Sequence, residues 1–517
     1  MGFLRYTLIF GTFGIVAHIV INVLYTKYPL HFDGEIVEGF DGVRKAFQQN
    51  FLDGWEAEGA SLAVYVKGQK AVDVWGGYAD KHAARKWKQD TLSVVFSCTK
   101  AVAAVCIAIL ADRGQLSYDD LVSKHWPGFA KNGKENITIE WVMSHMSGLP
   151  YLDTIITEDM AADHHLMRKV LEEEKPKFTP GISSGYHTLT YGWLVDQIVR
   201  HTDDKRRGIG QFLREEVTGP NGIDFHIGLN LSQDYRVARI SLPGTMDLIS
   251  EMWSSTHVLL RFFHFMTSNK NSAFNRAIGN PPWIDLWNKC TANNPEQHAM
   301  EQAAAFGIGN ARSLGSIFNL VSFICENNGE GFEVGVTILT HKSKTSARKT
   351  FEAFWINSKN LKMDCKEECL VITQEMESLK TVLTCLAAEV FLVQELVEFV
   401  EEWVFGWLED WRLVTGQLVS EKMLSFLEKP VVNETDYVVN AQMAKGHGFF
   451  YAPIEREEDS RLVHHSGHGC QQVTFDIHRQ VVIAYVTNAL KMGHFDNCRN
   501  YWRIHKTVYD VLEKSSK

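Results

Sequence analysis

A chain of 517 residues can bury a large core, and its 45% hydrophobic and 22% charged residues are ordinary for a folded protein. The net charge of −10 argues against a nucleic-acid partner, because such proteins carry basic patches. Nine cysteines over this length do not make the dense framework of a small disulfide-stabilised domain.

A long uncharged stretch lies near the start of the chain. No Asp, Glu, Lys or Arg occurs from position 6 to position 25, and about 20 apolar residues are enough to cross a bilayer as a helix. Arg5 precedes the stretch, and the residues after it lack the small side chains of a signal-peptidase site. We therefore predict an uncleaved signal anchor, a single transmembrane helix within residues 1–28, with the bulk of the chain lumenal or extracellular. A mitochondrial location is the alternative.

Two predicted hairpins frame the rest of the sequence. Residues 60–66 and 71–75 are strand-like around a polar turn, and residues 473–477 and 481–487 repeat the pattern near the other end. Helices are expected before the first hairpin, at residues 42–51, and after the second, at residues 497–512. Strands at both ends of the chain with helices between them predict one sheet in which the two ends meet.

Residues 101–110 have no polar face, which is typical of a helix buried on all sides. The segment is too short to span a membrane, so we predict a core helix that begins near Ser97 and ends near Gly114. Ser97 and Lys100 would then lie one turn apart, with Cβ atoms about 5–6 Å from each other. A lysine in a partly desolvated cleft has a lowered pKa and can help to take a serine proton. A helix cap beside a solvated lysine gives the same four-residue pattern, so the motif needs further support.

Six blocks in order supply that support. They are GASLAVYVKGQKAVDVWGGYAD, VFSCTKAVAAVCIAILADRGQLSYDD, MSHMSGLP, GYHTLTYGWLVDQIVR, GNARSL and HHSGHG. Together they resemble the serine β-lactamase-related family, which includes class C β-lactamases, family-VIII carboxylesterases, penicillin-binding proteins and animal β-lactamase domain-containing proteins. The resemblance covers roughly residues 40–320 and 416–517. It implies an α/β (α+β) fold of the β-lactamase/transpeptidase type, an antiparallel sheet flanked by helices plus an all-helical subdomain.

The resemblance also implies roles for particular residues. Tyr186 matches the family's tyrosine, which would share the proton work on Ser97 with Lys100, and we expect nearby cations such as Lys100 to lower its pKa. Thr188 stands where β-lactamases carry an asparagine that binds the substrate amide, so β-lactam turnover is in doubt. His145, in the loop block, is expected only to pack and hydrogen-bond locally.

The third family motif falls at His465, Ser466 and Gly467, with His in place of the usual Lys. A histidine is charged only part of the time at neutral pH, so it would hold a substrate carboxylate weakly. By resemblance, the N–H groups of Ser97 and His468 would form the oxyanion hole. The nearby histidines lack a carboxylate or Cys set at a known zinc spacing, so neither a metal nor a cofactor is expected.

One segment departs from the family pattern. We divide the chain into the anchor at 1–28, a first part of the β-lactamase-related domain at 29–320, an insertion at 321–416 and the last part of the domain at 417–517. The insertion contains a helix-like stretch rich in Val, Leu, Phe and Trp with a glutamate-rich polar face. A lid, a membrane-resting helix, a partner surface and a misjoined gene model are all open interpretations.

These patterns predict a serine hydrolase that cleaves an ester (or amide) bond through an acyl-enzyme on Ser97, most consistent with an esterase. The expected partners are a small-molecule ester or amide, a membrane through the N-terminal helix, and a second copy of the chain. A peptidase of the same fold is one alternative. A weakly catalytic, self-assembling scaffold is another, because a mitochondrial animal member of the family forms filaments.

Overall fold

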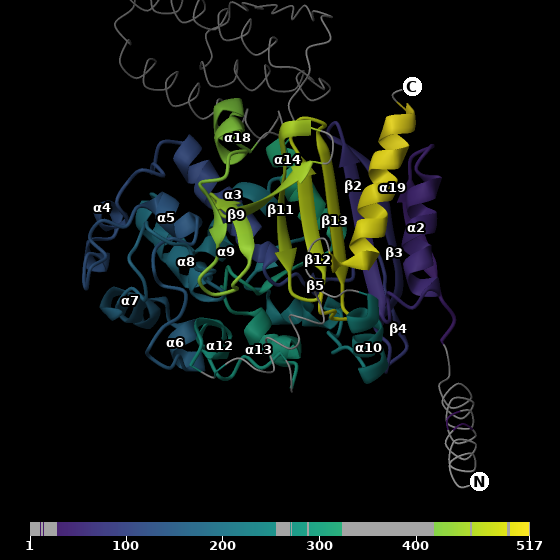
Figure 1. Cartoon of the computed structure of the whole chain (residues 1–517), viewed down its shortest axis with the longest axis horizontal. Coiled ribbons are helices and arrows are strands. Elements are labelled where there is room, and N and C mark those ends of the chain that lie inside the picture. Colours follow the sequence, from purple (N-terminus) through teal and green to yellow (C-terminus); the bar gives the residue numbers. More distant parts are fainter. Residues whose placement is uncertain are drawn as a thin grey trace, which may run out of the picture.

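The computed structural model describes residues 28–254, 269, 271–286, 289–322, 418–454, 457–493 and 497–515, together with Gly11 and Gly14. A large antiparallel sheet lies at the centre, with helices on both of its faces (Figure 1). Its strand order is β1-β3-β2-β13-β12-β11-β10-β9-β8, and β4 (Arg85–Lys86) pairs with β3 outside this path. The strands in this order are β1 (Phe32–Ile36), β3 (Gln69–Asp80), β2 (Gly59–Val66), β13 (Val481–Thr487), β12 (Gln471–Asp476), β11 (Glu457–Gly467), β10 (Phe449–Ile454), β9 (Gln442–Gly446) and β8 (Val432–Thr435).

The two ends of the chain meet in this sheet, as predicted. Strand β13 pairs with β2 along its whole length, with Ala484 opposite Ala63. Both predicted hairpins form: β2 turns into β3 at Lys67 and Gly68, whose positive φ angles of 49° and 80° suit a tight two-residue turn. The first and last parts of the domain therefore share one sheet, because the neighbouring strands β2 and β13 come from opposite ends of the chain.

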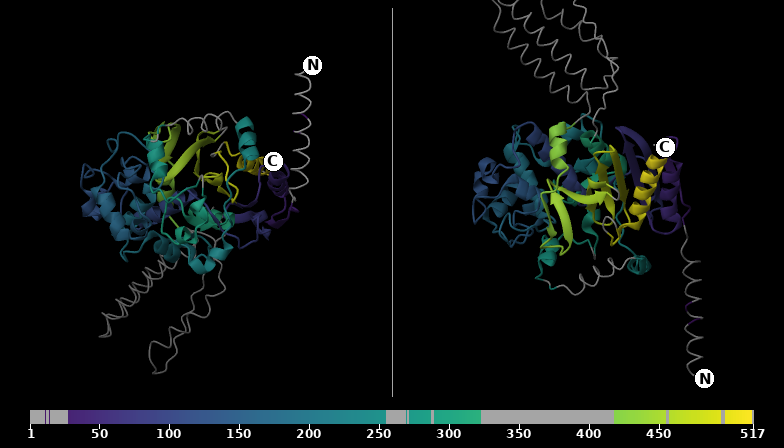
Figure 2. Two further views of the ribbon diagram at one scale, coloured as in Figure 1. Left: turned by 90° about the horizontal axis from the view of Figure 1, so that it is seen from below. Right: turned by 45° about the horizontal axis from the view of Figure 1, so that its top comes forward.

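Helices cover the two faces with separate apolar clusters. Helices α2 (Asp41–Leu52) and α19 (Arg499–Ser515) pack on one face through residues such as Phe47 and Ile504. Helices α3 (Cys98–Asp112) and α14 (Ala311–Ser322) belong to the larger cluster on the other face. Both views in Figure 2 place the α2–α19 pair and the helical region at opposite ends of the molecule.

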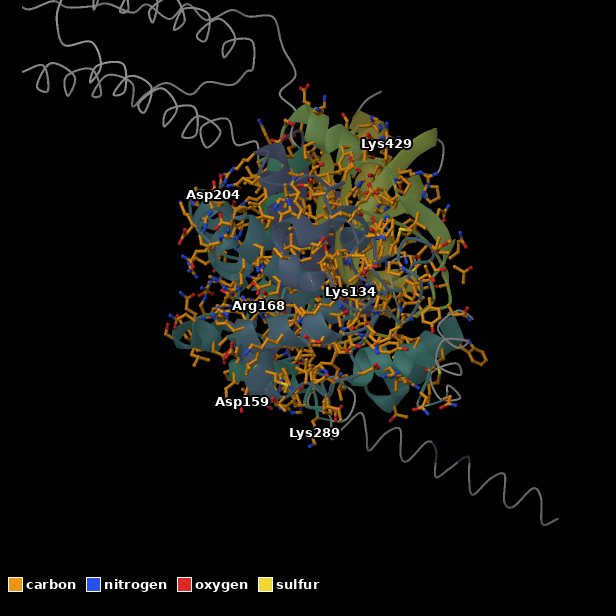
Figure 3. The ribbon with its side chains drawn as sticks, turned by 90° about the vertical axis from the view of Figure 1, so that its left-hand side faces the viewer. Lys134, Asp159, Arg168, Asp204, Lys289 and Lys429 are labelled. Carbon is orange, nitrogen blue, oxygen red and sulfur yellow. A yellow bond between two sulfur atoms is a disulfide. The ribbon has the colours of Figure 1, made fainter. Side chains whose placement is uncertain are left out.

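The helical region extends from the α3 side of the sheet. Its elements are α4 (Val122–His125), α5 (Ile139–Met143), α6 (Glu158–Ala162), α7 (His164–Glu173), α8 (Thr190–Thr202), α9 (Ile209–Leu213), α12 (Ala273–Gly279), α13 (Pro295–His298) and α18 (Glu421–Leu427). Helix α10 (Thr245–Ser254) lies apart from this region, near the start of α19, where Arg499 donates to Ser250 Oγ over 3.2 Å (Figure 1). Figure 3 faces this region, where charged side chains such as Asp159, Arg168 and Asp204 lie on the outside. A small second sheet, β5 (Ser93–Val94), β7 (Gly307–Gly309) and β6 (His226–Ile227), braces the start of α3.

Helix α3 confirms the predicted core helix. Every side chain from position 98 to position 110 is buried, which explains why the sequence has no polar face there. The helix ends at Asp112, and Gly114, which follows the C-cap residue Arg113, has a φ of +72°. The Gly114 N–H donates to the carbonyl of Ala111 and the Gln115 N–H donates to that of Leu110, each over 3.0 Å, so the last turn is closed by a Schellman motif.

Two further predictions fall largely on residues outside the described ranges. In the part of the chain that the structure describes, no helix has both the length and the apolar character needed to cross a membrane. The predicted anchor at residues 6–25 lies outside that part apart from its two glycines, and so does the insertion after Ser322. The residues on either side of the insertion are in contact, because the Leu418 N–H donates to the Leu320 carbonyl over 3.1 Å. Helix α14 continues two residues beyond the predicted boundary at 320.

Candidate active site

Ser97 lies at the start of α3, in the turn that joins β5 to the helix. The residue before it, Phe96, has a φ of +46°, an uncommon conformation for a bulky side chain. The Cys98 N–H donates to the Val95 carbonyl and the Thr99 N–H donates to that of Phe96. Ser97 itself is the N-cap residue and is partly exposed. The chain thus presents Ser97 at the mouth of an otherwise buried helix.

Thr99 fixes this turn from behind. Its buried hydroxyl donates to the Phe96 carbonyl over 2.5 Å and accepts from the Gly307 N–H over 2.8 Å. A Cβ atom at position 307 would lie only 2.5 Å from that hydroxyl oxygen, so β7 can come this close to Thr99 only because residue 307 is a glycine. One threonine therefore holds the strained Phe96 backbone against β7.

Lys100 is fully buried, and its Nζ atom lies 3.2 Å from Ser97 Oγ. The amine also donates to the Thr188 carbonyl over 2.8 Å and to the Ala304 carbonyl over 2.9 Å. Burial holds the pKa of Lys100 well below its usual value, because these neutral acceptors do not replace the solvation of an ammonium. A neutral amine has two hydrogens and one lone pair. The two carbonyls take the hydrogens, and the lone pair is left for the Ser97 hydroxyl.

Tyr186 lies beside both of these residues. Its ring centroid lies 4.9 Å from Lys100 Nζ, and its phenol is close enough to the Ser97 side chain for that group to act on its pKa. The prediction that cations lower its pKa is wrong. Desolvation of the phenol raises the pKa of Tyr186, the Ser97 side chain lowers it by less, and Lys100 is not a charged neighbour when its own pKa is low. Tyr186 is therefore a neutral phenol at physiological pH.

The loop that carries Tyr186 is held by two buried histidines. His187 donates from Nδ1 to the Gly185 carbonyl over 2.6 Å; since a carbonyl only accepts, Nε2 must be the acceptor of the Ser147 hydroxyl at 2.7 Å. The His187 N–H donates to His145 Nδ1 over 3.1 Å, and the His145 ring packs against Tyr186 at 4.9 Å between centroids. The expectation that His145 packs and hydrogen-bonds locally is confirmed, and no sequence pattern indicated that His187 is its partner.

The end of β11 lies directly against the start of α3. The Cys98 thiol donates to the His465 carbonyl over 3.3 Å. A Cβ atom at Gly467 would come within 2.3 Å of the Val95 carbonyl oxygen, so this close approach requires glycine. His468 follows in the turn after β11, with its ring 5.5 Å from that of Phe96. The structure thus brings Ser97, the third motif and the predicted oxyanion-hole residues into one region.

The histidines of this motif are less basic than the sequence suggested. Burial is the main cause that holds the pKa of His465 well below its usual value, and burial lowers that of His468 to about 4. The expectation of a partly charged His465 is therefore wrong, and the residue is neutral. Its Nδ1–H donates to the Ser466 carbonyl over 2.9 Å, so Nε2 carries a lone pair. That buried atom has no hydrogen-bond partner within the described ranges.

Three features escaped the sequence analysis. Thr188 contributes its backbone carbonyl to Lys100, and Ala304 does the same from a distant loop; main-chain carbonyls leave no signature in a sequence. A disulfide joins Cys470, just after the β11 turn, to Cys498 at the start of α19. The signal for it was the predicted lumenal location, which permits disulfides.

Within the described residues, no group of three or more His, Cys, Asp or Glu side chains could hold a metal ion.

This arrangement, a serine at the mouth of a buried helix between an antiparallel sheet and a helical region, defines the β-lactamase-like class of folds. The family model described as Beta-lactamase matches residues 47–347, more than half of the chain. The chain belongs to this β-lactamase family.

Relatives and solved structures agree with that assignment. The chain is 33% identical over 301 residues to "Esterase/beta-lactamase LipL" of Mycobacterium tuberculosis, an alignment that covers 56% of this chain and 63% of LipL. It superposes on a family VIII carboxylesterase with a TM-score of 0.66 and 21% identity, covering 93% of this chain and 100% of that one. It is also similar to a penicillin-binding protein homologue from Caulobacter crescentus, with a TM-score of 0.61, 24% identity, and 93% and 100% coverage. These two structural likenesses show the fold alone.

Proposed function

We propose that this protein is a serine hydrolase that cleaves a neutral ester through an acyl-enzyme on Ser97. The observation that carries the proposal is the pair formed by the partly exposed Ser97 and Lys100, 3.2 Å apart, with the lysine buried and its pKa held well below the usual value. A neutral amine at hydrogen-bond distance from a hydroxyl is the general base that such a nucleophile needs.

The first half of the reaction forms the acyl-enzyme. Ser97 Oγ attacks the ester carbonyl carbon while its proton passes to Lys100 Nζ, and the carbonyl oxygen becomes an oxyanion. The N–H of Ser97 is one donor for that oxyanion, because helix geometry gives an N-cap N–H no partner within α3. The N–H of His468 is the proposed second donor, since the end of β11 approaches the Val95 carbonyl and the His468 ring lies near that of Phe96, the residue before Ser97.

Tyr186 serves the leaving group. As a neutral phenol next to Ser97, it can give its proton to the departing alkoxide oxygen and regain one from the Lys100 ammonium. The intermediate collapses, the bond from carbonyl carbon to alkoxide oxygen breaks, and the alcohol leaves. A water molecule then attacks the acyl-enzyme, with the same groups moving its proton, and releases the acid and free Ser97.

The charge of the site favours a neutral substrate. The β-lactamases of this family are expected to bind the carboxylate of a β-lactam with a lysine at the position of His465. His465 is neutral in this protein and presents a lone pair on Nε2. A lone pair repels a carboxylate and suits an N–H or O–H donor. The name "Esterase/beta-lactamase LipL" supports an ester substrate, and the preference for a neutral ester over a β-lactam rests on the charge of the site.

The test is covalent labelling of the full chain with a fluorophosphonate probe, with the modified peptide located by mass spectrometry. We expect a label on the Ser97 peptide, none in Ser97→Ala, and turnover of p-nitrophenyl butyrate well above that of nitrocefin. Folded protein that neither takes the label nor hydrolyses either compound would refute the hydrolase and favour the scaffold. Efficient nitrocefin turnover would refute the preference for neutral esters.

We also propose that residues 6–25 anchor the protein in a membrane. The support is the length of the stretch and its lack of charged side chains. After extraction of membranes with alkaline carbonate, the full chain should stay in the pellet and a chain beginning at residue 29 should not. Release of both forms alike would rule the anchor out.

A further inference from the structure

The direction of the Lys100 lone pair depends on two carbonyls. Thr188, just before α8, and Ala304, in the loop before β7, lie far apart in the sequence, yet their carbonyls hold the same amine at 2.8 and 2.9 Å. Because both groups only accept, each takes one hydrogen of the neutral amine. The spacing of the two backbone segments therefore decides whether the remaining lone pair meets Ser97 Oγ.

One buried side chain joins these two segments. Gln302 is 2% exposed, and its Nε2–H donates to the Leu189 carbonyl over 2.9 Å. Its Oε1 accepts from the Ala304 N–H over 2.6 Å. Leu189 directly follows the residue whose carbonyl holds Lys100, and Ala304 carries the other carbonyl itself. The two ends of a single amide thus set the distance between the two supports of the lysine.

Helix α8 is shaped to admit this bridge. A Cβ atom at Gly192 would lie 2.2 Å from Gln302 Oε1 and 2.5 Å from the Ala304 N atom. Such distances are far inside van der Waals contact, so a side chain at position 192 would push the amide away from Ala304. Helix α8 therefore has a glycine, with no side chain, at the position next to the Gln302 amide.

We propose that Gln302 is a positioning residue that aims the Lys100 amine at Ser97. The inference rests on the proposed function, because it concerns the base of that reaction. The hydrogen bonds of the Gln302 side chain go to Leu189 and Ala304, and not to Ser97 or to Lys100 Nζ. Its effect is expected on the chemical step and not on substrate binding, and a misplacement of about 1 Å can cost roughly 10²-fold in rate.

Two variants separate the bridge from simple packing. Gln302→Met keeps the volume but removes both hydrogen bonds, and kcat for p-nitrophenyl butyrate should fall by about 10²-fold with KM nearly unchanged. Gln302→Glu keeps an acceptor for Ala304 but loses the donor to Leu189 and adds a negative charge near Lys100. That charge should raise the pKa of Lys100 and move the acid limb of the kcat profile to higher pH.

A buried glutamine on α8, Gln197, gives the matched control. Gln197 is also 2% exposed, and its amide donates to the His164 carbonyl over 3.0 Å, away from Lys100. Gln197→Met should lower the thermal midpoint as Gln302→Met does, while kcat stays within about twofold of the unchanged chain. A loss of kcat in both methionine variants would mean that buried amides matter only for packing and would overturn the proposal.

All variants are measured as full chains beside Ser97→Ala. If Ser97→Ala is inactive and Gln302→Met keeps its kcat, the positioning role is wrong while the hydrolase stands. If Ser97→Ala retains full turnover, the proposed function fails and the inference fails with it. Should Gln302→Met not fold, kcat of Gln302→Glu on the alkaline plateau of its pH profile decides: a value within about twofold of the unchanged chain overturns the proposal, and a loss of about tenfold or more with KM nearly unchanged supports it.

Discussion

A buried ion pair behind the Tyr186 loop should be far more costly to break than to replace. Lys445 on β9 and Asp436, just after β8, are in direct contact, and neither side chain has any exposed surface. The Asp436 carboxylate also accepts the N–H groups of Val438 and Val439, each over 2.8 Å. Desolvation is the main cause of the raised pKa of Tyr186, and the Asp436 charge adds to it, so the pair lies near the proposed site.

The magnitudes follow from what each substitution leaves behind. Asp436→Asn leaves a buried ammonium without its counter-charge and should lower the free energy of unfolding by about 3–5 kcal/mol. Lys445→Met leaves a carboxylate that still accepts two backbone N–H groups, so its cost should lie near about 3 kcal/mol. The double variant has neither charge and should come within about 1–2 kcal/mol of the unchanged protein.

The pH dependence has a definite sign. Burial lowers the pKa of Lys445, and Asp436 raises it by less. Without Asp436 the folded pKa falls further below that of the unfolded chain, so the unfolded state binds more protons at alkaline pH. The penalty of Asp436→Asn is therefore fully present below the folded pKa of Lys445 and is relieved as pH rises from that value toward the unfolded one. Lys445→Met has no such group and should show no relief.

Urea unfolding followed by tryptophan fluorescence, at neutral and at alkaline pH, measures all four proteins of this cycle. The slope of the unfolding free energy against urea should be the same in each, which shows that the variants share one folded state. Additive losses in the double variant would refute the reasoning, since two residues acting independently cannot restore one another. A cost below about 1 kcal/mol for Asp436→Asn would also refute it, because the lysine would then be solvated.

Three further outcomes are expected. The kcat of ester hydrolysis should fall as pH drops through the lowered pKa of Lys100, because an ammonium cannot accept the Ser97 proton; a pH–rate profile without an acid limb contradicts this. His465→Lys should raise the ratio of nitrocefin turnover to p-nitrophenyl butyrate turnover by about tenfold or more, because a lysine can donate a charged hydrogen bond worth roughly 1.5–3 kcal/mol to the carboxylate of nitrocefin. An unchanged ratio counts against the role given to His465. Replacing Cys470 and Cys498 together by Ser should cost about 3–4 kcal/mol for a 28-residue separation, measured by urea unfolding; an unchanged midpoint would show that the crosslink is not formed in solution.

The parts of the fold that were predicted correctly are those that local chemistry decides. Helix α3 is recognisable because a run without a polar face can only be buried, and its end because Gly114 adopts a positive φ. The hairpins are recognisable from strand-like runs around short turns. Ordered motifs then indicated that Ser97, Lys100 and Tyr186 lie together, and the contacts among them agree.

The protonation states were predictable only in part. The lowered pKa of Lys100 was expected from a partly desolvated cleft and agrees with the structure, whereas the expected lowering of the Tyr186 pKa was wrong, because desolvation raises it. The difference is set by burial, which depends on every segment packed around the site. The Ala304 carbonyl and the Gln302 amide come from a loop with no motif, so no local pattern could place them.

Burial also links the two parts of the proposed function, a β-lactamase-like arrangement and a preference for neutral esters. A cleft that recognises an anion must hold a cation, and a buried cation is costly unless it is paired. Here Lys100 and His465 are both deprived of solvent, and burial lowers the pKa of each. The same desolvation that makes the lysine a base therefore removes the positive charge that would bind a carboxylate. The proposed activation of Ser97 and the proposed preference for neutral esters would then share one physical cause, so a variant that hydrates this pocket should weaken both together.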